Sequence, residues 1–203
     1  MEKKMGFDLY GVKPKIKEGS VKPERPDWNT ATEIERDEYF SAMEKFETEN
    51  KGYYFRNNVW WWRPLAEFVI NCTLCVDKKD IPSWHHNDGH LVDEKTAKQI
   101  AKQLFHLLNT GKVKEYQEKH TEQRELAKKH NEKLSKKFDA LEKKVKKLTG
   151  KKDIAPSNYP EPYHSEWEKL YDEKDFRESY PFSESNVKEF AEFAEQSGGF
   201  TIC

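Results

Sequence analysis

Apolar and aromatic residues recur every three or four positions along much of the chain, a spacing that predicts amphipathic helices. The predicted helices are 30–50, 64–76, 93–110, 112–148, 165–174 and 183–196. Thr30 and Glu33 form a capping-box pattern at the start of the first helix. Pro64 suits the first turn of the second helix. Asp93 opens the third helix, and Gly111 follows it where a C-terminal glycine is expected.

The longest predicted helix carries a regular apolar seam. Its residues are spaced by four, three, four and three positions, and they are Leu134, Phe138, Leu141, Val145 and Leu148. This is a 3.5-residue repeat over two heptads, which is shorter than the three to four heptads expected of a coiled coil. Three alternatives stay open for this segment: it protrudes, it self-associates, or it folds back as a helical hairpin.

Two short segments, 6–12 and 200–203, are predicted to be strands, because they show alternating apolar and polar residues or are bounded by glycine. We expect them to pair with each other and to pack on helices, because an isolated two-stranded ribbon is only marginally stable. The predicted fold is a mostly α-helical single domain with a short terminal β-ribbon and a long protruding basic helix or helical hairpin. Its parts are a core over 1–111, a basic helical arm over 112–152, and a C-terminal segment over 153–203 that packs back on the core.

Composition limits the class of protein. Charged residues make up 36% of the 203 residues, against about 25% in an ordinary domain. The net charge of −1 and the 13% aromatic content nevertheless favour a folded chain over a disordered one. No apolar run approaches the length of a membrane span, residues 1–4 show no apolar signal region, and there are three cysteines. These features predict a reduced, cytoplasmic protein without a membrane partner.

Charge is segregated along the chain. Segment 112–152 holds 15 basic and 7 acidic residues, whereas 153–203 holds 4 basic and 12 acidic residues. The basic arm either binds nucleic acid, an acidic membrane or an acidic protein, or it is a helix that is solvated or packs near the acidic tail of its own chain. The candidate partner-binding residues are Lys143, Lys144, Lys146 and Lys147. No arginine or aromatic residue is interleaved with this lysine run, and the isoelectric point near 6.7 also argues against a nucleic-acid partner.

An aromatic block over 54–65 is the first candidate for a ligand site. Three consecutive tryptophans cannot all face one way on a regular element, so at least one is expected at the surface or in a cleft. Aromatic rings, arginines and amides together suit a nucleotide-like ligand. The candidate residues are Arg56, Asn57, Asn58, Trp60, Trp61, Trp62 and Arg63. The alternative is a corner of the core with two tryptophans inside, one outside, and the asparagines capping the next helix.

A cysteine and histidine group is the second candidate. Cys72 and Cys75, followed by His85, His86 and His90, offer ligand types and spacings that zinc uses. The gap between Cys75 and His85 is shorter than in a usual zinc finger. Cysteines three positions apart on a helix also pack as ordinary core residues. Zinc is therefore the one cofactor that stays open, and none is otherwise expected. The phosphate-loop, dinucleotide, serine-elbow and metalloprotease motifs are absent, and no catalytic residue is assigned.

Four segments carry a resemblance to known sequences: 5–11 (MGFDLYG), 54–65 (YFRNNVWWWRPL), the turn 87–89 (NDG) and 197–203 (SGGFTIC). Together they resemble an uncharacterised family of small proteins found largely in bacteriophage genomes. The resemblance spans nearly the whole chain and implies no activity, cofactor or catalytic residue. It does imply an accessory protein that acts by binding.

Three hypotheses follow for function. The first is a non-enzymatic phage accessory protein that binds and modulates a host or defence protein in the host cytoplasm. The second is a protein that binds or sequesters a small, nucleotide-like ligand through the aromatic block. The third is a zinc protein or enzyme built on the cysteine and histidine group. Self-association as a homodimer through the arm and the role of Cys203 stay open.

Overall fold

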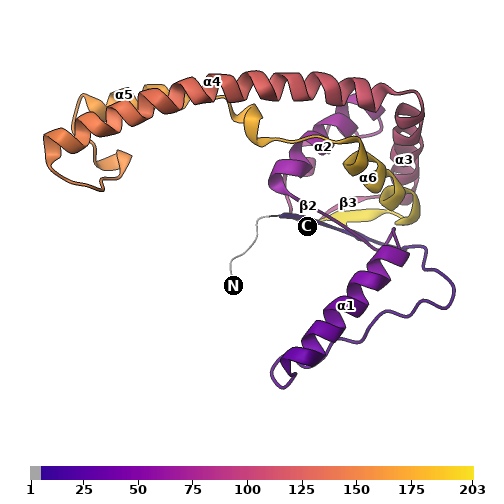
Figure 1. The fold of residues 1–203 in the computed structure, drawn as a ribbon. Coiled ribbons are helices and arrows are strands. Elements are labelled where there is room, and N and C mark those ends of the chain that lie inside the picture. Colours follow the sequence, from indigo (N-terminus) through magenta and orange to yellow (C-terminus); the bar gives the residue numbers. More distant parts are fainter. Residues whose placement is uncertain (1–5) are drawn as a thin grey trace. The chain divides into compact units, whose positions relative to one another are not determined.

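The computed structural model describes residues 6–203 and divides the chain into two compact units (Figure 1). Unit 1 contains the chain up to Gln117 together with Phe182–Cys203, and unit 2 contains Glu118–Pro181. The sequence-based boundaries were different, since all of 153–203 was expected to pack on the core. The expectation about a signal region at residues 1–4 lies outside the described residues.

The fold is mostly α-helical with a small β component, as the sequence predicted. The helices are α1 (Glu33–Glu49), α2 (Val59–Thr73), α3 (Glu94–Asn109), α4 (Lys112–Thr149), α5 (Tyr163–Asp172) and α6 (Glu184–Gln196). The strands are β1 (Gly6–Gly11), β2 (Tyr54–Asn58), β3 (His90–Val92) and β4 (Phe200–Ile202). Short 3-10 turns are η1 (Ile81–His85), η2 (Pro156–Asn158) and η3 (Phe176–Ser179). Within 6–203 no helix is long and apolar enough to span a membrane.

The sheet of unit 1 is larger than the predicted terminal ribbon. β1 and β4 pair antiparallel as expected, but β2 and β3 extend the sheet to the order β2-β1-β4-β3. Leu9 opposes both Phe55 and Ile202, and Val92 opposes Phe200, so these side chains share one face. That face packs against α2 and α6, and α3 packs on these two helices in the same core (Figure 1). The sheet therefore forms one wall of the core.

Local capping sets the helix starts. The capping residue of α1 lies two positions later than predicted, because Thr32 and not Thr30 forms the capping box, with Glu35. α2 begins at Val59, so Pro64 lies inside the helix instead of in its first turn. Asp93 caps α3 and Gly111 follows that helix with a φ of 73°, as predicted.

Unit 2 resolves the alternatives left open for the long helix. From residue 118 onward α4 packs against the segment 150–181, which we call the returning segment. Leu134, Leu141 and Val145 of α4 are buried in one cluster with Tyr159 and Leu170 of that segment. The two sides are also joined by hydrogen bonds, such as those from the Arg124 guanidinium to the carbonyl of Glu178 at 3.0 and 3.2 Å. The seam from Leu134 to Val145 is thus filled by the same chain in a helical hairpin, whereas its last residue, Leu148, is exposed. The structure does not support the alternative of a coiled coil.

Candidate functional site

The lysine run lies near the C-terminal end of α4, in unit 2. Lys143, Lys144 and Lys147 are exposed, and none of them has an ion-pair partner within 4.0 Å among the described residues. Lys146 differs, because its ammonium lies 2.7 Å from Glu142 Oε1. This hydrogen bond raises the pKa of Lys146. We call Lys143, Lys144 and Lys147 the lysine face.

The acidic returning segment leaves the lysine face uncompensated. Several of its acidic side chains pair with residues of the segment itself. One example is the ion pair of Asp175 with Arg177 at 2.6 Å, which lowers the pKa of Asp175. One ion pair reaches α4, from Glu173 to Lys137 at 3.4 Å. Segment 136–152 contains eight basic residues and two acidic ones. A concentrated positive charge therefore stays in contact with solvent.

The residues of the aromatic block have different structural roles. Trp62 is fully buried, its indole N–H donates to the carbonyl of Trp84 at 2.7 Å, and its ring stacks on Phe7. Asn58 caps α2 by accepting from the backbone N–H groups of Trp60 and Trp61 at 3.0 and 3.1 Å. These are the arrangements expected of a core corner.

The remaining residues of the block lie at the surface or reach other elements. Trp60 is 44% exposed, Trp61 is half-buried, and Arg63 is exposed. Asn57 Nδ2 donates to Asn186 Oδ1 on α6 at 3.0 Å. The expectation that at least one tryptophan reaches the surface is confirmed.

Arg56 belongs to a polar cluster on the sheet face opposite the core. Its Nε lies 3.4 Å from a carboxylate oxygen of Asp8, which also accepts from the Tyr54 hydroxyl. Burial, followed by the bond with Asp8, raises the pKa of Tyr54. The sequence analysis missed this pairing, although the alternation of β1 places Asp8 on the polar face.

The cysteine and histidine candidates are spread over a helix, a turn and a strand. Cys72 lies half-buried on α2, where burial raises the pKa of its thiol. His85 ends η1, His86 follows it, and His90 begins β3. Among residues 6–203 no group of three or more His, Cys, Asp or Glu side chains is arranged to hold a metal ion. All three cysteines, including the half-buried Cys203, are free thiols.

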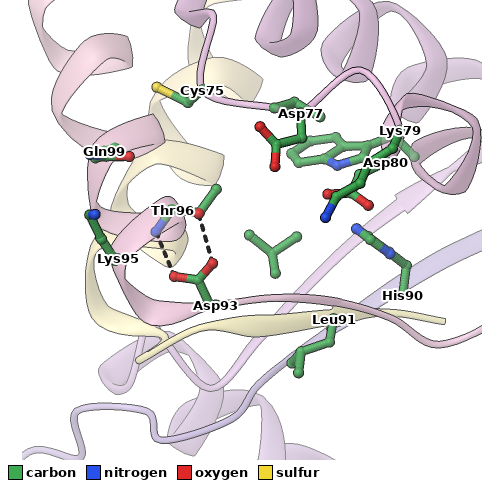
Figure 2. Close-up of a pocket in the computed structure, with 13 residues that line it drawn as sticks. Cys75, Asp77, Lys79, Asp80, His90, Leu91, Asp93, Lys95, Thr96 and Gln99 are labelled. Carbon is green, nitrogen blue, oxygen red and sulfur yellow. Dashed lines mark hydrogen bonds between the residues drawn. The ribbon is translucent and has the colours of Figure 1, made fainter.

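Two members of this group line a cavity of about 350 Å³ in unit 1 (Figure 2). Its walls come from the loop after α2, from η1, from β3 and from the first turns of α3. The lining residues are Cys75, Val76, Asp77, Lys79, Asp80, Trp84, His90, Leu91, Val92, Asp93, Lys95, Thr96 and Gln99. Sequence reasoning selected Cys75 and His90 but missed the neighbouring Asp and Lys residues, which carry no motif.

Comparison of the chain with family models, with curated proteins and with solved structures gave no match.

Proposed function

We propose that this chain is a non-enzymatic binding protein that recognises an acidic surface of a partner protein through the lysine face of unit 2. The observation that carries the proposal is the set of exposed ammonium groups of Lys143, Lys144 and Lys147, which lack a partner within the described chain. Exposed groups of one sign attract complementary surfaces and accelerate association. The resemblance to bacteriophage proteins further suggests a host or defence protein as the partner that is bound and modulated.

The packing of unit 2 also supports a role in binding. The apolar seam of α4 is filled from within the chain between Leu134 and Val145, so the exposed surface of this part of the helix is charged. Leu148 is 61% exposed between the lysines and adds one apolar contact point. A protein surface with several carboxylates around a small apolar patch fits these features.

Capture from a host lysate with matched charge reversals tests the proposal. The test variant is Lys143→Glu/Lys144→Glu/Lys147→Glu. The control reverses three exposed lysines nearer the start of the same helix, in Lys128→Glu/Lys129→Glu/Lys133→Glu. Both variants change the net charge equally, so only the position of the charge differs. Captured proteins are quantified at low and at high salt, and the folding of each variant is checked by circular dichroism.

We expect the test variant to lose a specific acidic protein that wild type and the control both retain. We also expect high salt to weaken the wild-type complex, because salt screens exposed charges. Equal capture by the test variant and wild type refutes the proposal. Equal loss in both variants also refutes it, since that result indicates unspecific attraction.

A further inference from the structure

We propose that the cavity in unit 1 between η1, β3 and the first turns of α3 binds a small, uncharged polyhydroxyl compound of the sugar class. This inference is independent of the lysine face, which lies in the other unit. It rests on three properties of the cavity: its size, the order of charges around it, and its unengaged polar groups.

The cavity has the dimensions of a small-ligand site. Its volume of about 350 Å³ lies at the lower end of the range of about 300–1,000 Å³ for ligand pockets. Trp84 and Val92 are 1% and 4% exposed and form its closed apolar side. Because the Trp84 ring is stacked on Trp62 inside the core, it closes the cavity, and recognition of a ligand falls to the polar groups around it.

Polar groups of both signs alternate around the cavity. Asp77, Lys79 and Asp80 follow one another on one wall, and His90 faces this wall from β3 (Figure 2). Lys95 lies at the α3 side. Asp93 is already engaged, because it accepts from the Thr96 backbone N–H at 3.0 Å and from the Thr96 hydroxyl at 2.8 Å.

Two carboxylates are left available to a ligand. The side chains of Asp77 and Asp80 form no ion pair within 4.0 Å and no hydrogen bond with another described residue. Asp80 stands before η1 but its side chain does not cap that turn. Neither carboxylate is therefore needed for a local structural bond. The ammonium groups of Lys79 and Lys95 likewise lack ion-pair partners among residues 6–203.

The order of charges selects the class of ligand. The carboxylates of Asp77 and Asp80 would repel an anion, and the ammonium group of Lys79 would repel an organic cation. A fully apolar ligand would remove these charged groups from water without replacing their hydrogen bonds. Hydroxyl groups avoid all three penalties, because each one both donates to a carboxylate and accepts from an ammonium.

Saturation-transfer NMR with a defined panel tests the inference. The probes are glucose, galactose, N-acetylglucosamine and ribose, with alanine, spermidine and methyl phosphate as charged comparators. The test variant is Asp77→Ala/Asp80→Ala, and the control is Asp37→Ala/Asp139→Ala, which removes two exposed carboxylates elsewhere. A second test variant, Lys79→Ala, removes a donor from the same wall. Folding of each variant is verified by circular dichroism.

We expect at least one sugar to receive saturation from wild type and the control, with a dissociation constant of about 1 mM or below. Asp77→Ala/Asp80→Ala should weaken that binding by at least about tenfold, because hydrogen bonds to charged groups are the stronger ones. Lys79→Ala should weaken it as well. The inference is overturned if no sugar binds, if only a charged comparator binds, or if the folded Asp77→Ala/Asp80→Ala variant binds the sugar as wild type does.

Discussion

The three consecutive tryptophans provide a direct test of how the structure divides the aromatic block. Trp62 is fully buried, lies 5.3 Å from the Phe7 ring and 5.9 Å from the Trp84 ring, and donates to the Trp84 carbonyl at 2.7 Å. Trp60 is 44% exposed on the same helix. We therefore predict that Trp62→Phe destabilises the protein far more than Trp60→Phe does, although the chemical change is identical.

The magnitude follows from the contacts of the indole. Trp62→Phe removes the N–H donor and leaves the buried Trp84 carbonyl without it, which costs about 1–1.5 kcal/mol. The smaller ring also leaves unfilled space between Phe7 and Trp84, at about 1–2 kcal/mol. The free energy of unfolding should fall by about 3 kcal/mol, which corresponds to about 6–12 °C in melting temperature for a chain of this length. Trp60→Phe should change the free energy of unfolding by less than about 0.5 kcal/mol.

Urea unfolding followed by the helical circular dichroism signal measures both variants against wild type. The near-ultraviolet spectrum reports separately whether the aromatic packing of unit 1 is lost. Loss of stability in Trp62→Phe equal to that in Trp60→Phe contradicts this account of the block. It would mean that Trp62 is not the residue that fills the core.

Three further predictions concern the backbone, a helix cap and the hairpin. Gly52→Ala should destabilise unit 1, measured by thermal melting, because an added Cβ meets the backbone of Gln196 and a backbone neighbour cannot swing aside. Asp93→Ala should cost about 0.5–2 kcal/mol in urea unfolding. The Thr96 backbone N–H and hydroxyl favour the ionised carboxylate, so the pKa of Asp93 is lower in the folded protein than its usual value of 3.8. The stability that Asp93 adds to wild type should therefore be fully present at pH values above 3.8 and be lost as the pH falls through the lowered folded-state pKa. Leu141→Ala should cost about 2–5 kcal/mol and increase hydrogen exchange in unit 2 but not in the sheet of unit 1.

Helices with local signals at both ends could be predicted from the sequence. Asp93 caps α3 in the structure, and Ser183, the first residue of the predicted helix 183–196, caps α6. The capping residue of α1 was wrong by two positions for a specific reason: Thr30 and Thr32 each precede a glutamate by three positions. The structure uses Thr32, while the Thr30 backbone N–H donates to the carbonyl of Asp27 in a turn. Two equally good capping boxes cannot be ranked without that turn.

The sheet could be predicted only at its termini, because only 6–12 and 200–203 show the alternation or the glycine boundaries that are typical of strands. β2 opposes β1 across roughly fifty residues, and β3 has three residues, too few to show alternation. The cavity is different, because all its lining residues lie within the continuous stretch 75–99. The way η1, β3 and the start of α3 fold around it is not visible in the sequence, where Asp77, Lys79 and Asp80 form no motif.

The long helix shows why an apolar repeat alone does not identify the surface that fills it. The same seam would suit a second copy of α4 or a segment of its own chain, since both offer apolar side chains at the required spacing. The segment after Gly150 decides between them, because it supplies Tyr159 and Leu170 to the seam. A partner that used the seam would have to displace these residues. The lysine face needs no such displacement, and for this reason we propose that a partner is recognised by the charged side of the hairpin.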